Sequence, residues 1–223
     1  MSSSSEAASG TSARAAGRDD ASTRERILEV ALQSFAELGF DGASTRSIAA
    51  RAGINQGLIP YYFGTKDALW REAVGRAFAR LNEALGGAAQ DASAVSSRDR
   101  LAVLIRRYLR FVAAHPEFVM LMNEEGKRDS ERMRWLVDNH VRPIQQVMTS
   151  LYERAADSEE GVVRIGTPHF QYLFIGATSA IFHQAPECRR VFGVDPMDPK
   201  VVDAHADAVV LLFLGDASLG RED

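Results

Sequence analysis

The sequence has few of the features that secretion or membrane insertion requires. Cysteine occurs once, at Cys188, so no disulfide can form within the chain, which fits a reducing compartment. No apolar run approaches the roughly 20 residues that span a bilayer. The N-terminus lacks the basic-then-apolar pattern of a secretory signal. We therefore expect a cytoplasmic protein that makes no use of a membrane.

Motifs of catalysis are missing as well. The five histidines show no HExxH or ExxH spacing, so no metal site is indicated. The chain has no GxSxG, no P-loop and no glycine-rich dinucleotide fingerprint. We predict no enzyme, no cofactor, and no catalytic or metal-ligating residue.

A strong positive charge is also absent. The net charge is −4, which argues against a protein that coats nucleic acid without specificity. Between residues 23 and 75, basic and acidic side chains are equal in number. Any affinity of this segment for DNA must come from where its charges lie.

The most informative stretch is STRSIAARAGINQGLIPYYFGTK, residues 44–66. Ser44 can cap a first short helix, and Gly53 can leave that helix in the left-handed conformation that glycine adopts without steric cost. Asn55 is a good N-cap for a second helix. This is the sequence form of a DNA-binding helix-turn-helix.

A supporting helix is predicted ahead of this stretch. It begins with a capping box at Ser22 and Glu25 and carries an apolar stripe at helical spacing. Gly39 ends it, and Phe40 is placed for the apolar contact that follows such an end. Residues 1–21 are mainly Ser, Ala and Gly, and we expect them to be a disordered tail.

These residues resemble the DNA-binding domain of the TetR (tetracycline repressor) family of bacterial regulators. The resemblance rests on RILEVALQSFAELGF, STRSIAARAGI, NQGLIPYYF and GTKDAL, in that order. It implies an all-α fold of about nine helices. We expect a three-helix DNA-binding domain over 22–66 and a C-terminal helical domain for ligand binding and dimerisation over 67–223.

Several side chains of the helix-turn-helix suit contact with DNA. Thr45 and Arg46 can hold a phosphate. Gln56 can pair with adenine, and Leu58 can touch a thymine methyl. The resemblance adds Tyr61, Tyr62 and Lys66 as contacts to phosphates or bases. The expected DNA-binding residues are Thr45, Arg46, Asn55, Gln56, Gly57, Leu58, Tyr61, Tyr62 and Lys66.

Pro60 departs from the family pattern, which most often has tyrosine there. It removes a helical hydrogen bond to Gln56 and biases Ile59 away from the helix. We therefore expect a short or distorted recognition helix.

The rest of the chain reads as further helices. One, from Ser130, contains Pro143, which removes a backbone hydrogen bond to the carbonyl of Asn139 and predicts a kink. The resemblance implies a pocket for a small, partly apolar molecule. The candidate lining residues are Phe111, Phe118, Met122, Trp135, Asn139, His140, Tyr172, Phe174 and His183. The alternative is that these aromatic residues are ordinary core.

The two last predicted helices, over 167–185 and 199–214, are apolar almost all round. Such helices must be buried, and two at the end of the chain indicate a homodimer. We predict a transcriptional regulator, most simply a repressor that binds a palindromic operator of double-stranded DNA as a dimer and is released by a small molecule. The alternatives are a ligand-independent DNA-binding or nucleoid protein, and a helical enzyme with a vestigial DNA-binding domain.

Overall fold

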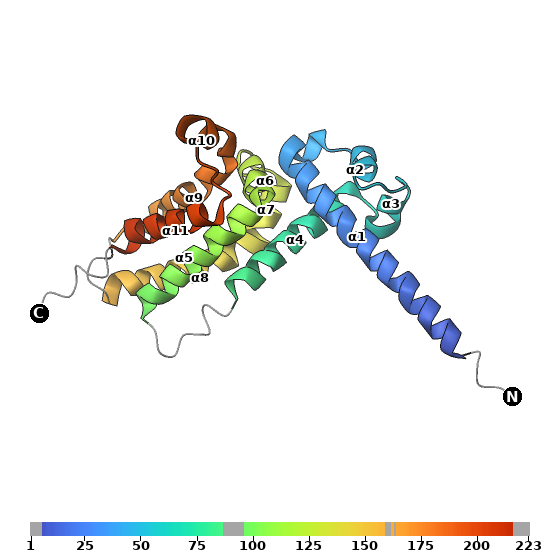
Figure 1. Ribbon diagram of the computed structural model, residues 1–223, viewed down its shortest axis with the longest axis horizontal. Helices are drawn as coiled ribbons and strands as arrows, with labels where there is room; N and C mark the ends of the chain where they lie inside the picture. The colour runs from blue at the N-terminus through green and yellow to red at the C-terminus, as the bar shows by residue number, and fades with distance from the viewer. Residues whose placement is uncertain (1–5, 87–95, 159–161, 163, 216–223) are drawn as a thin grey trace, which may run out of the picture. The chain divides into compact units, whose positions relative to one another are not determined.

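The chain folds into helices without any β-strand among the residues that the structure describes (Figure 1). The computed structural model describes residues 6–86, 96–158, 162 and 164–215. The described helices form two compact units, Met1–Ala77 and Phe78–Asp223. The predicted all-α class is confirmed. The division between the units falls inside a helix, later in the chain than the predicted boundary at 66/67.

The first unit holds three helices and the start of a fourth. They are α1 (Glu6–Gly42), α2 (Thr45–Arg51), α3 (Leu58–Phe63) and α4 (Lys66–Leu85), which continues into the second unit. Their apolar faces meet in one core, which contains Ile27, Leu28, Leu32, Phe35, Ile48, Ile59, Phe63, Leu69, Trp70 and Val74.

Helix α1 begins at Glu6, well before the predicted start at Ser22, so the structure shows helix where we expected a disordered tail. Alanine, which recurs in this segment, is the best helix former. Extending an existing helix also avoids the cost of nucleation. At the other end, the helical conformation is interrupted at Gly39 (φ 69°, ψ 169°), where the sequence predicted the helix to end. The Phe40 ring stacks on that of Phe35 with 5.8 Å between centroids.

The second unit is built around α5 (Ser97–Ala114). It also contains α6 (Pro116–Gly126), α7 (Glu131–Leu136), the π-helical segment η1 (Val137–Val141), α8 (Arg142–Ser158), α9 (Thr167–His183), α10 (Ala185–Phe192) and α11 (Pro199–Leu214). Helix α5 packs against α8, α9 and α11. An ion pair between Arg110 and Asp203, 2.9 Å apart, also joins α5 to α11.

The predicted effect of Pro143 takes the form of a π-turn. Proline cannot donate a hydrogen bond to the carbonyl of Asn139. The chain widens to a π-helix just before it, and the amide of Arg142 donates to the carbonyl of Val137. The long predicted helix is therefore divided into α7, η1 and α8. Helix α10 was not predicted.

Among the described residues, no helix is both long enough and apolar enough to cross a membrane.

Candidate DNA-binding surface and effector cavity

The turn between α2 and α3 is fixed by two backbone hydrogen bonds around Gly53. Its φ of 64° lies in the left-handed region. The amide of Gly53 donates to the carbonyl of Ala50 (3.2 Å), and that of Ile54 donates to the carbonyl of Ala49 (3.0 Å). This pair of bonds is the Schellman motif that glycine permits. The predicted role of Gly53 is confirmed.

The start of α2 is held by a reciprocal pair of serines. The amide of Ser47 donates to the hydroxyl of Ser44 (3.0 Å), and the amide of Ser44 donates to the hydroxyl of Ser47 (3.1 Å). This capping box fixes the helix end. It thereby positions Thr45, which is half-buried, and Arg46, which is exposed.

Helix α3 starts three residues after Asn55. The amide of Gly57 donates to the side-chain oxygen of Asn55 (2.8 Å), so Asn55 closes a tight turn ahead of the helix. The prediction that Asn55 is the N-cap was wrong, because Gly57 occupies that position. Pro60 then occupies the first turn of α3, where a backbone N–H has no partner within the helix in any case. The recognition helix is short, Leu58–Phe63, as expected, and Pro60 does not break it.

A shallow hollow brings part of the expected DNA-binding set together. Its lining consists of Thr45, Gln56, Gly57, Ile59, Pro60, Gly64, Thr65 and Lys66. Arg46, Asn55, Leu58, Tyr61 and Tyr62 lie outside this lining. The sequence argument missed Gly64 and Thr65 and treated Pro60 only as a disruption. Gly64 and Thr65 belong to the GTK segment directly after α3, and this position could have indicated that they line the hollow.

The two tyrosines of α3 differ in their surroundings. The Tyr61 side chain is 74% exposed. The Tyr62 ring packs edge-on against Tyr61, with 5.0 Å between centroids. The Tyr62 hydroxyl donates a hydrogen bond to Asp20 of α1. This hydrogen bond to a carboxylate raises the pKa of Tyr62 to about 12.

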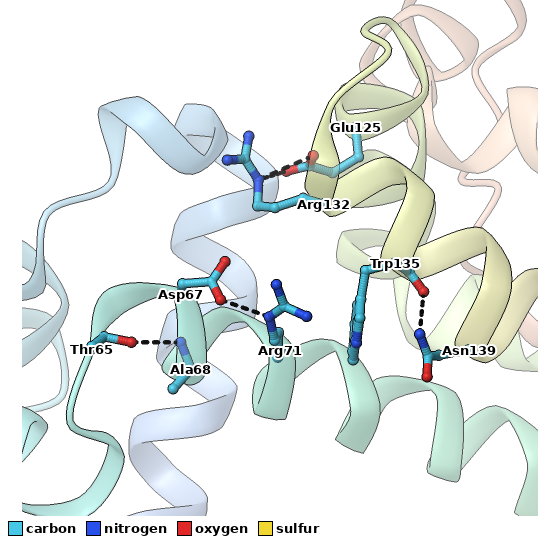
Figure 2. A network of polar contacts seen from close by, with 8 residues as sticks. All are labelled: Thr65, Asp67, Ala68, Arg71, Glu125, Arg132, Trp135 and Asn139. Atoms are coloured by element: carbon cyan, nitrogen blue, oxygen red, sulfur yellow. Dashed lines mark hydrogen bonds and ion pairs between the residues drawn. The ribbon is translucent and has the colours of Figure 1, made fainter.

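Helix α4 starts beside the hollow. The hydroxyl of Thr65 accepts a hydrogen bond from the amide of Ala68 (3.1 Å), so Thr65 caps the start of α4 (Figure 2). The ammonium of Lys66 lies 4.5 Å from the centre of the Phe40 ring. This cation–π contact places the charge of Lys66 at the edge of the hollow.

Four arginines of the first unit form ion pairs with carboxylates of the same unit. Arg51 forms two hydrogen bonds to Glu37 (2.7 and 3.1 Å), which join α2 to α1. Arg71 pairs with Asp67 at 2.6 Å within α4 (Figure 2). Arg24 pairs with Glu72, and Arg76 with Glu25, between α1 and α4. Arg46 forms no ion pair among the described residues, so its exposed charge remains available to a phosphate.

The second unit contains a cavity with a volume of about 100 Å³. Helices α4, α5, α6, η1, α8 and α9 contribute to its wall. The lining residues are Phe78, Leu81, Leu85, Tyr108, Phe118, Val119, Met122, Asn123, Val141, Ile144, Gln145, Met148, Gln171, Phe174 and Ile175. No acidic, basic or histidine side chain is among them.

Four lining side chains are polar. The Gln145 amide donates to the Thr149 hydroxyl at 3.0 Å. Tyr108 packs against Phe174 with 5.4 Å between ring centroids. Removal from water raises the pKa of Tyr108 to about 12. Its hydroxyl forms no hydrogen bond to another described residue. Asn123 and Gln171 complete the polar set.

The predicted ligand-binding residues separate into three groups. Phe118, Met122 and Phe174 line the cavity. Phe111 and His140 lie behind the lining residues and contact them. The Phe111 ring packs on Phe118 at 5.4 Å, and the His140 ring stacks on Phe78 at 4.7 Å. Burial lowers the pKa of His140.

The remaining predicted ligand-binding residues lie elsewhere, because helical rotation or exposure separates them from the cavity. Trp135 packs against His140. Asn139 is exposed and donates to the carbonyl of Trp135 (Figure 2). Tyr172 and His183 are exposed on α9. The sequence argument selected Tyr172, but each residue turns an α-helix by about 100°. Gln171, Phe174 and Ile175 therefore share the cavity face, whereas Tyr172 points away from it.

Helices α9 and α11 also carry an exposed apolar surface. They pack against each other and lie side by side (Figure 1). Tyr172, Leu173 and Leu212 are 76%, 55% and 64% exposed. Exposed apolar clusters of this kind mark contact surfaces. The surface lies on the two helices that the sequence indicated for dimerisation.

Comparison with known proteins defines the class. Residues 27–73 match the family described as "Bacterial regulatory proteins, tetR family". Residues 98–212 match the family described as "Tetracyclin repressor-like, C-terminal domain". The chain belongs to the TetR family and is a DNA-binding transcriptional regulator, so the resemblance is confirmed.

Individual relatives agree with this assignment. The HTH-type transcriptional repressor NicS of Pseudomonas putida is 31% identical over 206 residues, which cover 88% of this chain and 91% of NicS. A TetR-like regulator from Rhodococcus sp. RHA1 has a similar fold, with TM-score 0.62, 22% identity, and coverage of 90% of this chain and 97% of that one. AibR, solved with isovaleryl coenzyme A and operator DNA, gives TM-score 0.67, 17% identity, and coverage of 86% and 98%.

Proposed function

We propose that this regulator is a cytoplasmic repressor that binds a palindromic operator as a dimer and is released when a small, uncharged, largely apolar molecule enters the cavity. One observation carries the proposal. The single helix α4 contributes Leu69 and Trp70 to the core of the DNA-binding unit and lines the cavity with Phe78 and Leu81. A molecule in the cavity therefore contacts the helix on which the DNA-binding unit is built.

The lining supports an uncharged, mostly apolar effector. A charged group placed in this cavity would be removed from water without a countercharge, which costs several kcal/mol. An uncharged, mostly apolar molecule avoids that cost. The Tyr108 hydroxyl offers a hydrogen-bond donor to a carbonyl or ether oxygen of such a molecule. Gln171 and Asn123 can orient further polar groups.

The dimer follows from the apolar surface of α9 and α11. A two-fold dimer presents the same surface from both subunits. Each subunit would place α3 in the major groove, at half-sites about 34–36 Å apart or a multiple of that spacing. An effector that favours the non-binding spacing by about 3 kcal/mol would weaken operator binding roughly a hundredfold.

Operator binding is the first test. The purified protein is titrated with DNA from its own upstream region against random competitor at fixed salt, because phosphate contacts depend steeply on salt. We expect sequence-specific retention, and Gln56→Ala should weaken it about 5- to 100-fold through loss of a base contact. Gln33→Ala removes an exposed amide of the same kind from α1 and is the matched control. If genome-wide selection of bound fragments also shows no sequence preference, a ligand-independent DNA-binding protein replaces the repressor.

Effector binding is the second test. Neutral apolar compounds that carry one carbonyl are screened by the rise in Tm and by release of the operator. Tyr108→Phe should lower the affinity for a compound that binds by about 5- to 10-fold, because one hydrogen bond is lost. The stability of the free protein should be nearly unchanged. Conversion of the bound compound into a product would support the alternative of an enzyme. Tight binding of charged compounds only would contradict the assigned effector class.

A further inference from the structure

The N-terminal part of α1 brings a carboxylate to the recognition helix. Asp20 lies on α1, and its Oδ1 accepts the hydrogen bond from the Tyr62 hydroxyl of α3. The match to the family begins only at residue 27. The Asp20 contact therefore comes from a part of this chain that the family match does not cover.

This contact occupies the donor that a DNA phosphate would need. A tyrosine hydroxyl carries a single hydrogen. Contacts to the DNA backbone are mostly hydrogen bonds from side-chain donors to phosphate oxygens. A hydrogen bond to an ionised carboxylate is about twice as strong as one between neutral groups. Tyr62 cannot fully satisfy Asp20 and a phosphate at the same time.

The charge of Asp20 adds to this competition. Asp20 is exposed and forms no ion pair with any other described residue. Within about 8–10 Å, an exposed carboxylate repels phosphates at physiological salt. Asp20 therefore opposes DNA in two ways: it occupies the Tyr62 hydroxyl, and it carries a charge of the same sign as the backbone.

We propose that Asp20 is a negative determinant of operator affinity: it holds the Tyr62 hydroxyl in the free protein, and operator binding must replace this carboxylate with a phosphate oxygen. This inference rests on the proposed operator binding. It makes the N-terminal segment of α1 a part of the DNA-binding surface that sets the affinity of the free repressor.

The test is a double-mutant cycle on the full-length protein. Operator Kd is measured at fixed salt for the wild type, Asp20→Asn, Tyr62→Phe and Asp20→Asn/Tyr62→Phe. Asp20→Asn should tighten binding about 3- to 10-fold, because the hydroxyl is released and the repulsion is removed. In the Tyr62→Phe background the same substitution should change Kd less than twofold, because there is no hydroxyl to release and only the salt-screened repulsion of an exposed charge is removed.

Each other result overturns the inference. Equal tightening in both backgrounds would show that only charge repulsion is at work. Unchanged or weaker binding of Asp20→Asn would show that Asp20 does not oppose DNA, or that it orients Tyr62 toward it. If the wild type itself shows no preference for any operator, the proposed function and this inference both fail. Specific wild-type retention with an unchanged Asp20→Asn variant overturns this inference alone.

A second readout does not depend on DNA. The absorbance of the Tyr62 phenolate is followed against pH as the difference between each protein and the same protein with Tyr62→Phe. In Asp20→Asn the pKa should fall from about 12 toward its ordinary value of 10. Helical content and Tm of every variant show whether α1 and α3 remain folded. If the phenol pKa does not change, the hydrogen bond between Tyr62 and Asp20, on which the inference is based, is contradicted.

Discussion

Each unit contains an ion pair between an arginine and a glutamate, and the two pairs differ in how deeply they are buried. In the DNA-binding unit, Arg51 and Glu37 meet on the surface, with 38% and 48% of their side chains exposed. In the cavity unit, Arg132 pairs with Glu125 (3.2 Å), and their side chains are only 20% and 5% exposed (Figure 2). The first pair remains hydrated, whereas the second has given up most of its water.

Because of this difference, the loss of one partner should cost less stability in the exposed pair than in the buried pair. Exposed pairs contribute little and are screened by salt. The DNA-binding unit therefore depends on its apolar core and can present its surface charges to DNA. A buried pair must stay complete, because either charge alone is costly in a dry site. The cavity unit therefore contains one buried pair, Arg132 with Glu125, that must stay complete, while the wall of its cavity carries no charge.

Removal of one buried carboxylate should give the largest effect. Glu125→Ala takes the carboxylate away from Arg132 in a mostly dry site, and we expect a loss of about 3–5 kcal/mol of unfolding free energy. Urea denaturation followed by circular dichroism measures it. The matched variant in the other unit is Glu37→Ala, which should cost about 0–1 kcal/mol. Equal losses in the two variants would remove the contrast between the units.

A smaller effect, of opposite sign, is expected at Gly75. This glycine lies inside α4, just before the division between the units, and a Cβ added there would meet no atom within 4 Å. Gly75→Ala should stabilise the protein by about 0.5–1 kcal/mol, because glycine is a poor helix former. The Tm should rise by about 1–4 °C for a chain of this size. A lower Tm would mean that α4 needs the freedom of glycine at this position.

The smallest of the three effects concerns pH. Burial lowers the pKa of His140 below its ordinary value of 6.5. Below that value the unfolded chain binds a proton that the folded chain resists, so stability should fall as the pH decreases from 6.5. His140→Phe should flatten this dependence, measured as unfolding free energy at pH 7 and pH 5.5. His183→Phe, at an exposed site on α9, is the control and should leave it unchanged.

The sequence predicted best what depends on local chemistry. Gly53 at a helix end and Ser44 at a helix start act through their own backbone, so their roles could be read from a few neighbours. Helix α3 is short, as expected, but Pro60 is tolerated within it. Its tolerance in the first helical turn depended on where α3 begins, and that start is set by the hydrogen bond between Asn55 and Gly57.

The cavity was harder to predict because it depends on how six segments face one another. Of the aromatic and histidine candidates, Phe118 and Phe174 line the cavity, whereas Tyr172 and His183 lie on another face of α9, which the sequence argument did not take into account. Gln171 and Tyr108 were not identified as lining residues, because a polar residue on an apolar face can be recognised only when the face that lines the cavity is known. The helical N-terminal segment was missed because its composition suits both a tail and an extension of α1.

The uninterrupted course of α4 limits how such regulators can be recombined. The division between the units falls at Ala77/Phe78, in the middle of this helix. One residue inserted there would turn Phe78 and Leu81 by about 100° relative to Trp70. Seven inserted residues would restore the angle to within about 20°. A chimaera that takes its DNA-binding unit from a relative must therefore keep the helical register of α4. Insertions of arbitrary length, which a loop would accept, are excluded between Ala77 and Phe78.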